Sequence, residues 1–448
     1  MNASDATLLE RLVADARRVA MPRRRGRVRS VVGLQLEVEG LAPAIGDSVT
    51  IEGSDGVIEA EVVGLRAESC TCMVYGELHG VRVGANVDLV DRPPAIRVGE
   101  HLLGRVLDGL GRPMDGAPLP AGLEELPLEA RAPHPLERSV IDQQISLGVR
   151  ALDTLMPCGR GQRLGIFAGS GVGKSSLLSM IARGSEASVS VIALIGERGR
   201  EVREFLERDL GPAGLARSVV VVATSDSPPL VRLRAAFVAT RIAEWFRDRG
   251  EHVVLMMDSV TRFAMAQREV GLAAGEPPAT RGYPPSTFGL LARLLERAGA
   301  GATGSITGLY TVLVEGDDLN DPIADHTRSI LDGHVVLSRR LATSGHFPSI
   351  DVLESISRLT PAITTAHDRA AANQLRQLLA AHRDTRDLID IGAYVTGSNP
   401  QVDRAVSLVP HIDRFLRQEF DDVTPAAEAW ARLRDLLRDD SLEAQEAS

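Results

Sequence analysis

The chain has 448 residues, of which 44% are hydrophobic and 25% charged, and its formal net charge is -10 at pH 7. This length allows two or three domains with a large apolar core, and the negative charge argues against a protein that binds nucleic acid over its whole surface. Three cysteines (Cys70, Cys72 and Cys158) are too few and too badly spaced for a disulfide framework or a closed zinc site. The chain shows no secretory signal pattern and no apolar run long enough to cross a membrane, so a cytosolic protein with reduced thiols is expected.

The first predicted element is a short amphipathic helix over residues 1–23. After the possible caps Ser4 and Asp5, apolar residues recur at helical spacing from Leu8 to Ala20. Arginines at positions 17, 18, 23, 24, 25, 27 and 29 give the acidic chain a dense basic segment. This segment is either a solvated charged stretch or a surface that attracts anionic lipid or an acidic partner, and the sequence leaves both open.

Residues 24–92 follow a different pattern, with short alternating stretches separated by glycines. Strands are predicted at 28–32, 34–38, 48–51 and 58–63. Many short strands with frequent turns predict a small β-barrel. An RNA-binding barrel stacks bases on several aromatic side chains, whereas this region contains only Tyr75. We therefore predict a barrel that serves assembly, and no nucleic-acid partner.

Between residues 93 and 370, apolar strands alternate with helical patterns, which predicts a parallel sheet covered on both faces. The strands are expected at 163–168, 189–195, 219–223, 253–258, 309–314 and 334–337, with helices such as 175–183 and 229–249 between them. After residue 370 the strands stop. Helical patterns at 371–382, 401–420 and 425–437 predict an α-helical C-terminal domain over 371–448.

The segment from Ala168 to Ser175 reads AGSGVGKS, follows an apolar strand and opens a helix, which is the context of a phosphate-binding P-loop. Ala168 replaces the first glycine of the usual pattern, a mild departure. Lys174 is the only lysine among the fifty lysine and arginine residues of the chain. A composition bias toward arginine has removed lysines that supply only charge, but a planar guanidinium does not fit where a P-loop ammonium lies between phosphate oxygens.

The P-loop predicts binding of ATP with Mg²⁺. Glycines in the loop allow backbone N–H groups to face the phosphates, and the N-terminus of the helix adds its positive dipole. Ser175 is expected to bind the magnesium ion. The residues assigned to nucleotide binding are Gly169, Ser170, Gly171, Val172, Gly173, Lys174, Ser175 and Ser176.

Two carboxylates follow neighbouring apolar strands. Asp258 ends the run 253–258, which brings it to the edge of the sheet beside the phosphates, where it can orient magnesium. Glu197 follows the strand 189–195 and can polarise an attacking water, and its neighbour Arg198 can contact the γ-phosphate. The alternatives are that Asp258 only ends a strand and that Glu197 and Arg198 only form ion pairs within a loop.

Several further segments carry a resemblance to the F1-type rotary ATPase superfamily, and more narrowly to its type III protein-export ATPases. They read GERGRE at 196–201, DSVTRF at 258–263, GEPPATRGYPPS at 275–286, DDLNDPI at 317–323 and ILDGHVVLSRR at 330–340. The similar region runs from about Arg24 to Arg404. The resemblance implies a RecA-like central domain at 93–370 and a homohexameric ring in the cytoplasm, peripherally associated with the inner membrane.

The resemblance also implies roles for individual residues. The family's catalytic glutamate matches Glu197, and Arg262 lies within a matched motif and is counted with the catalytic residues. The family's arginine finger, donated by a neighbouring subunit, matches Arg358; from the sequence pattern alone, Arg358 is an ordinary surface charge. Phe347 matches the aromatic residue that stacks on adenine, and the alternative is that Phe347 packs in the core.

By the same resemblance, the chain powers export of flagellar proteins. The C-terminal domain lacks the acidic run of rotary β subunits, and IGAYVTGS at 391–398 is more similar to flagellar than to injectisome members. The implied partners are a negative regulator at the N-terminal helix, a central stalk protein, export-gate membrane proteins and chaperone–cargo complexes. Three alternatives stay open, namely an injectisome ATPase, an RNA-dependent ring translocase and a non-catalytic ring subunit.

Overall fold

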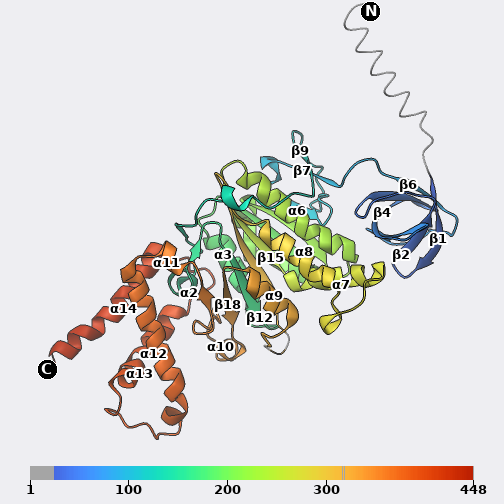
Figure 1. Cartoon of the computed structure of the whole chain (residues 1–448). Helices are drawn as coiled ribbons and strands as arrows, with labels where there is room; N and C mark the ends of the chain where they lie inside the picture. The colour runs from blue at the N-terminus through green and yellow to red at the C-terminus, as the bar shows by residue number, and fades with distance from the viewer. Residues whose placement is uncertain (1–24, 315, 317, 447–448) are drawn as a thin grey trace, which may run out of the picture. The chain divides into compact units, whose positions relative to one another are not determined.

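The computed structural model describes residues 25–446 except 315 and 317, with side chains described as far as Arg438 (Figure 1). The predicted amphipathic helix over residues 1–23 lies outside the described residues. The chain divides into two compact units, Met1–Pro94 with Val270–Glu276, and Ala95–Glu269 with Pro277–Ser448. Each unit is built around its own cluster of buried apolar side chains.

The first unit contains a closed β-barrel. Its strands pair in the order β1-β2-β5-β4-β3-β6, and β6 pairs with β1 to close the ring. Side chains alternate between the interior and the solvent, and Leu36, Val49 and Val87 are fully buried. The bounds are β1 Gly26–Val32, β2 Gln35–Glu39, β3 Ser48–Gly53, β4 Gly56–Leu65, β5 Ser69–Val74 and β6 Asn86–Leu89. The predicted barrel is confirmed.

The second unit is built on a mostly parallel sheet with the order β19-β18-β12-β17-β15-β13-β14-β8. Only β19, paired with β18, and β16, paired with β17, run antiparallel among the described strands of this sheet. The bounds are β8 Val106–Asp108, β12 Arg163–Ala168, β13 Val189–Glu197, β14 Ser218–Thr224, β15 His252–Asp258, β16 Gly299–Ala300, β17 Ser305–Leu313, β18 Gly333–Leu337 and β19 Ile356–Ser357. Two small ribbons pair β7 Ala95–Val98 with β9 Glu124–Pro127, and β10 Gln144–Ile145 with β11 Cys158–Gly159.

Each strand predicted for this sheet is present, but β17 begins earlier than expected and the short strands β8, β16 and β19 were not predicted. β17 begins at Ser305 rather than at residue 309, because its first residues, Ser305, Thr307 and Gly308, are small or polar and do not read as an apolar run. The short edge strand β8 was not predicted, since only Leu107 of its three residues is buried. The predicted α/β class is confirmed.

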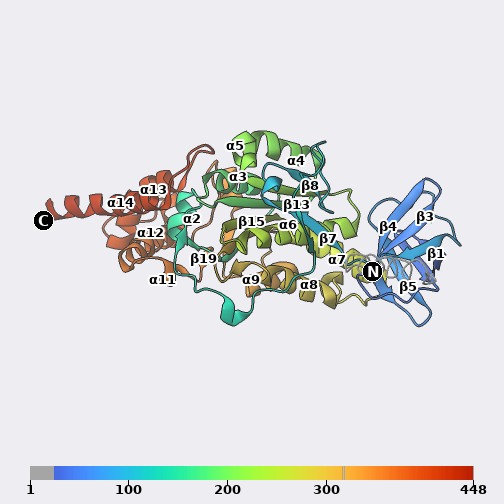
Figure 2. The ribbon, with the colours of Figure 1, turned by 90° about the horizontal axis from the view of Figure 1, so that it is seen from above.

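Helices cover both faces of the sheet, as Figure 2 shows for α4 and α5 on one side and α8 and α9 on the other. Helix α6 packs on β13, β14 and β15 and contacts α8. The bounds are α3 Lys174–Gly184, α4 Gly199–Glu204, a π-helical turn Phe205–Leu210, α5 Gly211–Ala216, α6 Pro229–Arg247, α7 Val260–Ala274, α8 Pro285–Glu296, α9 Pro322–Ile330, α10 Arg339–Thr343 and α11 Thr360–Ile363. Short 3₁₀ turns lie at Glu100–Leu102, Pro135–Glu137 and Thr280–Gly282.

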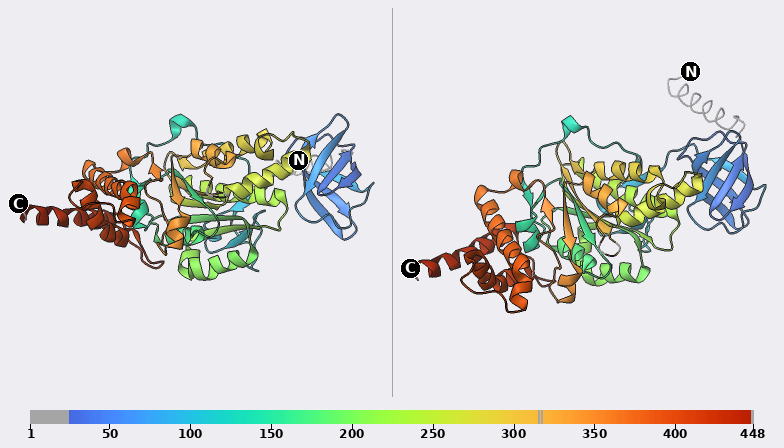
Figure 3. Two further views of the ribbon diagram at one scale, coloured as in Figure 1. Left: turned by 90° about the horizontal axis from the view of Figure 1, so that it is seen from below. Right: turned by 60° about the horizontal axis from the view of Figure 1, so that its bottom comes forward.

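The C-terminal helices, drawn in orange to red in Figure 3, form a bundle with the blue-green helix α2 Arg150–Leu155. They are α12 Ala366–Asp390, α13 Pro400–Leu416 and α14 Ala426–Glu446. Helix α13 ends at Leu416 rather than at residue 420, because the Arg417 backbone is extended and the buried Gln418 side chain donates to the Gly148 carbonyl instead. Within the described part of the chain, no helix combines the length and apolar composition needed to cross a bilayer.

Candidate functional site

The P-loop connects β12 to α3 at the carboxyl edge of the sheet. Gly171 (φ 73°) and Gly173 (φ 92°) adopt the left-handed region, which a residue with a Cβ rarely enters. Gly173 is also the N-cap of α3 and offers no side chain to cap it, so the first N–H groups of that helix face the loop without a side-chain acceptor. This geometry suits an anion at the loop.

Two contacts fix the loop from the side of β18. Ser349 Oγ donates to the Val172 carbonyl at 2.5 Å, and Arg339 Nη1 donates to the Ser170 carbonyl at 3.1 Å. The hydroxyl-bearing residues Ser175 and Ser176, in the first turn of α3, are exposed. The loop is therefore held from outside while its inner face remains accessible.

Lys174 lies between two carboxylates. Its Nζ donates to Glu197 Oε1 at 3.1 Å and to Asp258 Oδ1 at 2.5 Å, and Thr311 Oγ1 donates to the same Asp258 oxygen at 2.7 Å. The three ionisable side chains are only 12%, 18% and 5% exposed, in the order Lys174, Glu197, Asp258. The sheet brings them together because Leu194 of β13 is in register with Asp258 of β15, and Glu197 follows at the same edge.

The pKa values in this cluster follow from burial and charge. Burial alone would lower the pKa of Lys174, but Asp258 and Glu197 outweigh it, so the pKa of this lysine is raised and its ammonium is retained. Burial raises the pKa of Asp258, and the nearby Glu197 carboxylate adds to this although Lys174 opposes it. Two carboxylates and one ammonium leave a net negative cluster, which favours a cation.

The oxygen donors present fit a magnesium ion. The Asp258 carboxylate and the Ser175 hydroxyl are hard oxygen ligands of the kind that Mg²⁺ prefers, and Mg²⁺ usually keeps few protein ligands beside phosphate oxygens and water. Ser175 directly follows Lys174 in the first turn of α3, and Lys174 contacts Asp258. Ser175 and Asp258 are therefore the residues that would hold the ion.

Arg262 and Arg198, the two arginines expected near the phosphates, lie in different surroundings. The Arg262 side chain packs against Gly196, and its buried Nε has no hydrogen-bond partner among the described residues. It therefore packs against the residue that precedes Glu197 in the chain and has an unused donor at Nε. Arg198 is 77% exposed and pairs with Glu201 at 3.2 Å, so the structure does not bring it to Lys174.

A cavity of about 1030 Å³ adjoins the P-loop helix. Its walls include Gly173 and Leu177 on one side, Phe347 on another, and Gln418 and Phe420 from the C-terminal segment. Phe347 is 46% exposed, so it is not a core residue, and its ring lies 3.4 Å from the point where a Cβ on Gly173 would stand. This arrangement gives a flat aromatic ring beside the loop, suitable for stacking.

Sequence reasoning missed the C-terminal side of this cavity. Phe420 was expected inside a helix, but it lies under the Arg183 guanidinium at 4.1 Å, and its carbonyl accepts from Arg183 Nη2 at 2.7 Å. Gln418 N donates to the Phe347 carbonyl at 2.9 Å, which joins the two walls. Two aromatic residues that line one cavity but lie far apart in sequence carry no local signal.

Arg358 lies far from its own P-loop. β19 pairs with the beginning of β18 (Gly333↔Ser357), whereas the end of β18 (Leu337) pairs with Ala168 beside the P-loop. The intervening length of β18 is about 13 Å at the usual rise per residue. Ser357 is buried while Ile356 is 49% exposed and Arg358 is also exposed, so the alternation of the strand presents an apolar and a cationic side chain at the surface.

The fold and the site define a P-loop nucleotide-binding protein with a barrel before the P-loop domain and a helical domain after it. Family models agree with each part: the β-barrel domain of the ATP synthase alpha/beta family matches residues 28–89, its nucleotide-binding domain matches 148–357, and the C-terminal domain of the type III secretion ATPase EscN matches 364–435. The chain belongs to the family of flagellum-specific ATP synthases and type 3 secretion system ATPases.

Individual relatives show how complete the similarity is. The chain is 52% identical to the flagellum-specific ATP synthase of Bacillus subtilis (strain 168), over 92% of this chain and 95% of that protein. It is 50% identical to the type 3 secretion system ATPase of Xanthomonas euvesicatoria, over 93% and 94% of the two chains. The structure of the assembled ATPase EscN from the enteropathogenic E. coli type III secretion system matches with a TM-score of 0.88 at 46% identity, covering 92% of this chain and 99% of that chain.

Proposed function

We propose that this protein is the Mg²⁺-dependent ATPase of a bacterial flagellar protein-export apparatus, and that it acts as a homohexameric ring. The observation that carries the proposal is the contact of Lys174 with both Glu197 and Asp258 at the end of a P-loop strand. A buried lysine ammonium held by two carboxylates beside an accessible P-loop is typical of sites that catalyse phosphoryl transfer. Ring assembly is supported by a solved structure of the related EscN, described as assembled.

Each residue of the edge cluster has a proposed role. The P-loop N–H groups and Lys174 bind the phosphates, and Ser175 with Asp258 holds the magnesium ion, which when bound neutralises charge on the phosphate oxygens. Glu197 acts as the base that orients and polarises the attacking water. Arg262 has a buried and unused Nε beside Gly196, which suits a contact to the γ-phosphate.

The outer residues complete the site. Phe347 stacks on adenine from the cavity wall, and Phe420 lines the same cavity beneath Arg183 of the P-loop helix. Arg198 takes part only if it leaves its exposed pair with Glu201. Arg358 serves the pocket of a neighbouring subunit, since about 13 Å of strand separates its backbone from its own P-loop and the exposed Ile356 beside it suits a subunit contact.

Relatives of both flagellar and injectisome systems are about equally similar, at 52% and 50% identity. The flagellar assignment is supported by the segment 391–398 and by several flagellum-specific relatives. Deletion of the gene in the source organism should abolish motility and leave injectisome secretion intact. The opposite result would assign the protein to an injectisome.

The proposed partners follow from the same relationship. A solved structure of EscN with its central stalk EscO, at a TM-score of 0.85, supports a stalk partner for this chain. We further propose a negative regulator at residues 1–23, export-gate membrane proteins, chaperone–cargo complexes and anionic lipid as contacts, with the ring in the cytoplasm at the inner membrane. The proposed domain boundaries remain 24–92, 93–370 and 371–448.

The catalytic role of Glu197 can be tested by Glu197→Gln, which keeps the shape but removes the base. The variant should bind nucleotide with unchanged affinity, because Asp258 still pairs with Lys174. Its turnover should fall by about 10² or more, the usual contribution of a general base. Turnover at the wild-type rate would show that another group activates the water.

The donation of Arg358 across a subunit seam can be tested by mixing two inactive variants. Arg358→Ala has an intact P-loop but no finger, and Lys174→Ala has a finger but a defective P-loop. If both are mixed before ring assembly, about a quarter of the seams combine an intact P-loop with an intact finger. Activity should therefore return to roughly that fraction of wild type. No recovery would argue against donation in trans.

A further inference from the structure

We propose that Gln162 is a positioning residue for Arg358. Gln162 lies directly before β12 and the P-loop directly after it, so the two ends of this strand serve two different ATP pockets of the ring. This inference rests on the proposed donation of Arg358 to a neighbouring subunit. It adds a residue whose role lies outside the P-loop and outside the contacts of Arg358 itself.

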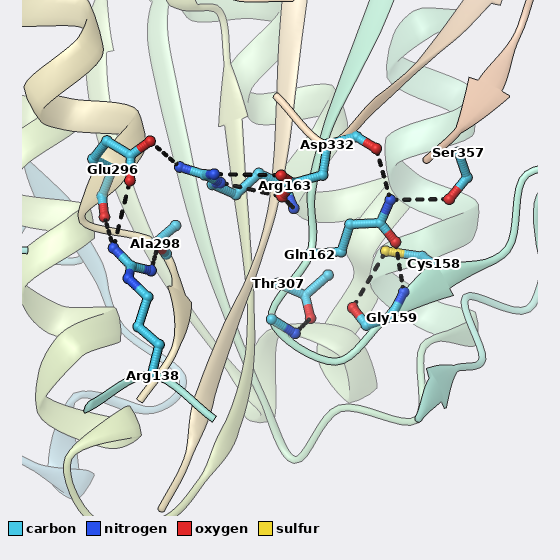
Figure 4. A network of polar contacts seen from close by, with 11 residues as sticks. Arg138, Cys158, Gly159, Gln162, Arg163, Glu296, Ala298, Thr307, Asp332 and Ser357 are labelled. Atoms are coloured by element: carbon cyan, nitrogen blue, oxygen red, sulfur yellow. Dashed lines mark hydrogen bonds and ion pairs between the residues drawn. The ribbon is translucent and has the colours of Figure 1, made fainter. Parts of the chain in front are cut away.

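The Gln162 side chain is fully buried and all of its hydrogen-bonding groups are engaged (Figure 4). Its Nε2 donates to Ser357 Oγ at 2.9 Å and to the Asp332 carbonyl at 3.2 Å, and its Oε1 accepts from the Gly159 N–H at 2.8 Å. An amide has two donor hydrogens and one carbonyl oxygen, so this set uses the whole group. The position of Gln162 is therefore fixed from three sides.

Both groups that accept from Gln162 Nε2 also hold the backbone of Arg358 in place. The Arg358 backbone N–H donates to the same Asp332 carbonyl at 2.9 Å, and Ser357, directly before Arg358, donates through Oγ to the Pro157 carbonyl at 2.7 Å. Ser357 is buried, whereas Arg358 points to the surface. The network thus holds the backbone on the inner side, while the exposed guanidinium makes one long contact, from Nη2 to the Arg328 carbonyl at 3.5 Å.

A second layer fixes Asp332. Its carboxylate accepts from the Arg163 backbone N–H at 3.0 Å and from Arg163 Nε at 3.2 Å, and Arg163 also pairs with Glu296 at 2.6 Å (Figure 4). Arg163 is the first residue of β12, and Gln162 immediately precedes it. Two consecutive residues at the start of this strand therefore hold both the carboxylate and the carbonyl of Asp332.

The other end of β12 is Ala168, which leads into the P-loop. The strand pairs with β17 from Arg163 to Ala168 and with β18 from Gly165 to Ala168, so it places the network around Arg358 and the P-loop at its two ends.

The decisive variant is Gln162→Leu, which keeps the volume and removes every hydrogen bond of the amide. Because Gln162 and the P-loop lie at opposite ends of β12, binding of the fluorescent nucleotide mant-ADP with Mg²⁺ should stay within about twofold of wild type, and kcat should fall by about 10- to 100-fold, as expected for a misplaced catalytic group. Thr307→Val is the matched control. It removes the Thr307 Oγ1 that accepts from the buried Gly161 N–H at 2.9 Å, next to Gln162 in the chain, and it leaves Ser357 and Asp332 unchanged, so it should keep the wild-type kcat.

Mixing separates this proposal from a merely structural effect. A mixture of Gln162→Leu with Lys174→Ala should regain activity. At some subunit interfaces the intact P-loop of the first variant then meets the correctly positioned Arg358 of the second. A full kcat for Gln162→Leu alone, or a low kcat with no recovery on mixing, overturns the proposal. The parallel mixture of Arg358→Ala with Lys174→Ala distinguishes the two failures. If that mixture recovers activity but the Gln162→Leu mixture does not, only the role of Gln162 is contradicted. If neither mixture recovers activity, donation in trans and this proposal are both contradicted.

A folding failure of Gln162→Leu is covered by a milder variant. Ser357→Ala removes the acceptor of the Gln162 bond and the donor to Pro157, with no change in charge and a small change in volume. The same recovery with Lys174→Ala is expected, and its absence from a folded, nucleotide-binding Ser357→Ala protein would count against the proposal.

Discussion

Replacing Arg150 tests whether the C-terminal segment is a true wall of the nucleotide cavity. The Arg150 side chain is 7% exposed and donates to the Phe415 carbonyl at 2.9 Å, to Asp422 Oδ2 at 2.5 Å, to Thr424 Oγ1 at 3.0 Å and to the Arg417 carbonyl at 2.5 Å. These contacts hold residues 415–424, the stretch that turns away from α13 and contributes Gln418 and Phe420 to the cavity.

The magnitude follows from the burial of this group. Arg150→Met keeps the length and apolar stem but leaves a carboxylate and several carbonyls without their donor. Asp422 is 36% exposed and water can replace its contact, so the loss comes mainly from the carbonyls and Thr424, and leaving a buried group without its hydrogen-bond partner costs about 1–3 kcal/mol. The wall formed by Phe420 should loosen as well, and losing one aromatic contact to the base, about 1.4 kcal/mol, weakens nucleotide binding about tenfold.

The assay uses the two tryptophans of the chain, Trp245 and Trp430. In a Trp245→Phe background, Trp430 of α14 reports on the C-terminal bundle alone, and urea unfolding should show the loss of stability. Binding of mant-ADP with Mg²⁺ gives the affinity. Arg160→Met is the matched control, because its pair with Glu186 is partly exposed, at 33% and 42%, and surface pairs contribute about 0–1 kcal/mol.

Two outcomes would refute this reasoning. An unchanged unfolding midpoint would mean that the contacts of Arg150 are replaced by water at no cost. A large loss of stability with wild-type nucleotide affinity would mean that residues 415–424 are not part of the binding site.

Two other changes give separate tests. Phe347→Ala should weaken mant-ADP binding about tenfold while lowering stability by less than about 1 kcal/mol, because the ring is 46% exposed; equal losses in both would make it a packing residue. Asp115→Asn tests the pH dependence of stability. The hydrogen bond from Arg105 lowers the pKa of Asp115 to about 2, below the ordinary value of about 3.9. The carboxylate therefore stabilises the fold above about pH 4, and this contribution disappears as the pH falls toward 2. Urea titrations should show a penalty of about 1 kcal/mol at pH 7 that shrinks at pH 3, and a penalty independent of pH would contradict the assignment.

Much of the architecture was readable from local pattern. The barrel strands alternate with a period of two, and the sheet strands are apolar runs such as 189–195, because both faces of a parallel sheet are buried. The ends of helices and strands were less accurate where polar residues begin an element, as in β17, or where tertiary contacts end one early, as in α13.

The sequence by itself determined the chemistry of the P-loop, because glycine geometry, one retained lysine and a strand ending in Asp258 are local features with one physical purpose. Only the tertiary structure decided which distant groups complete the site. Gln162 contacts Ser357, and Arg150 holds residues 415–424, across separations in sequence that no spacing or periodicity encodes. The position of Arg358 was likewise settled by strand pairing, since the register of β18 and β19 places this arginine at the end of β18 that lies away from the P-loop.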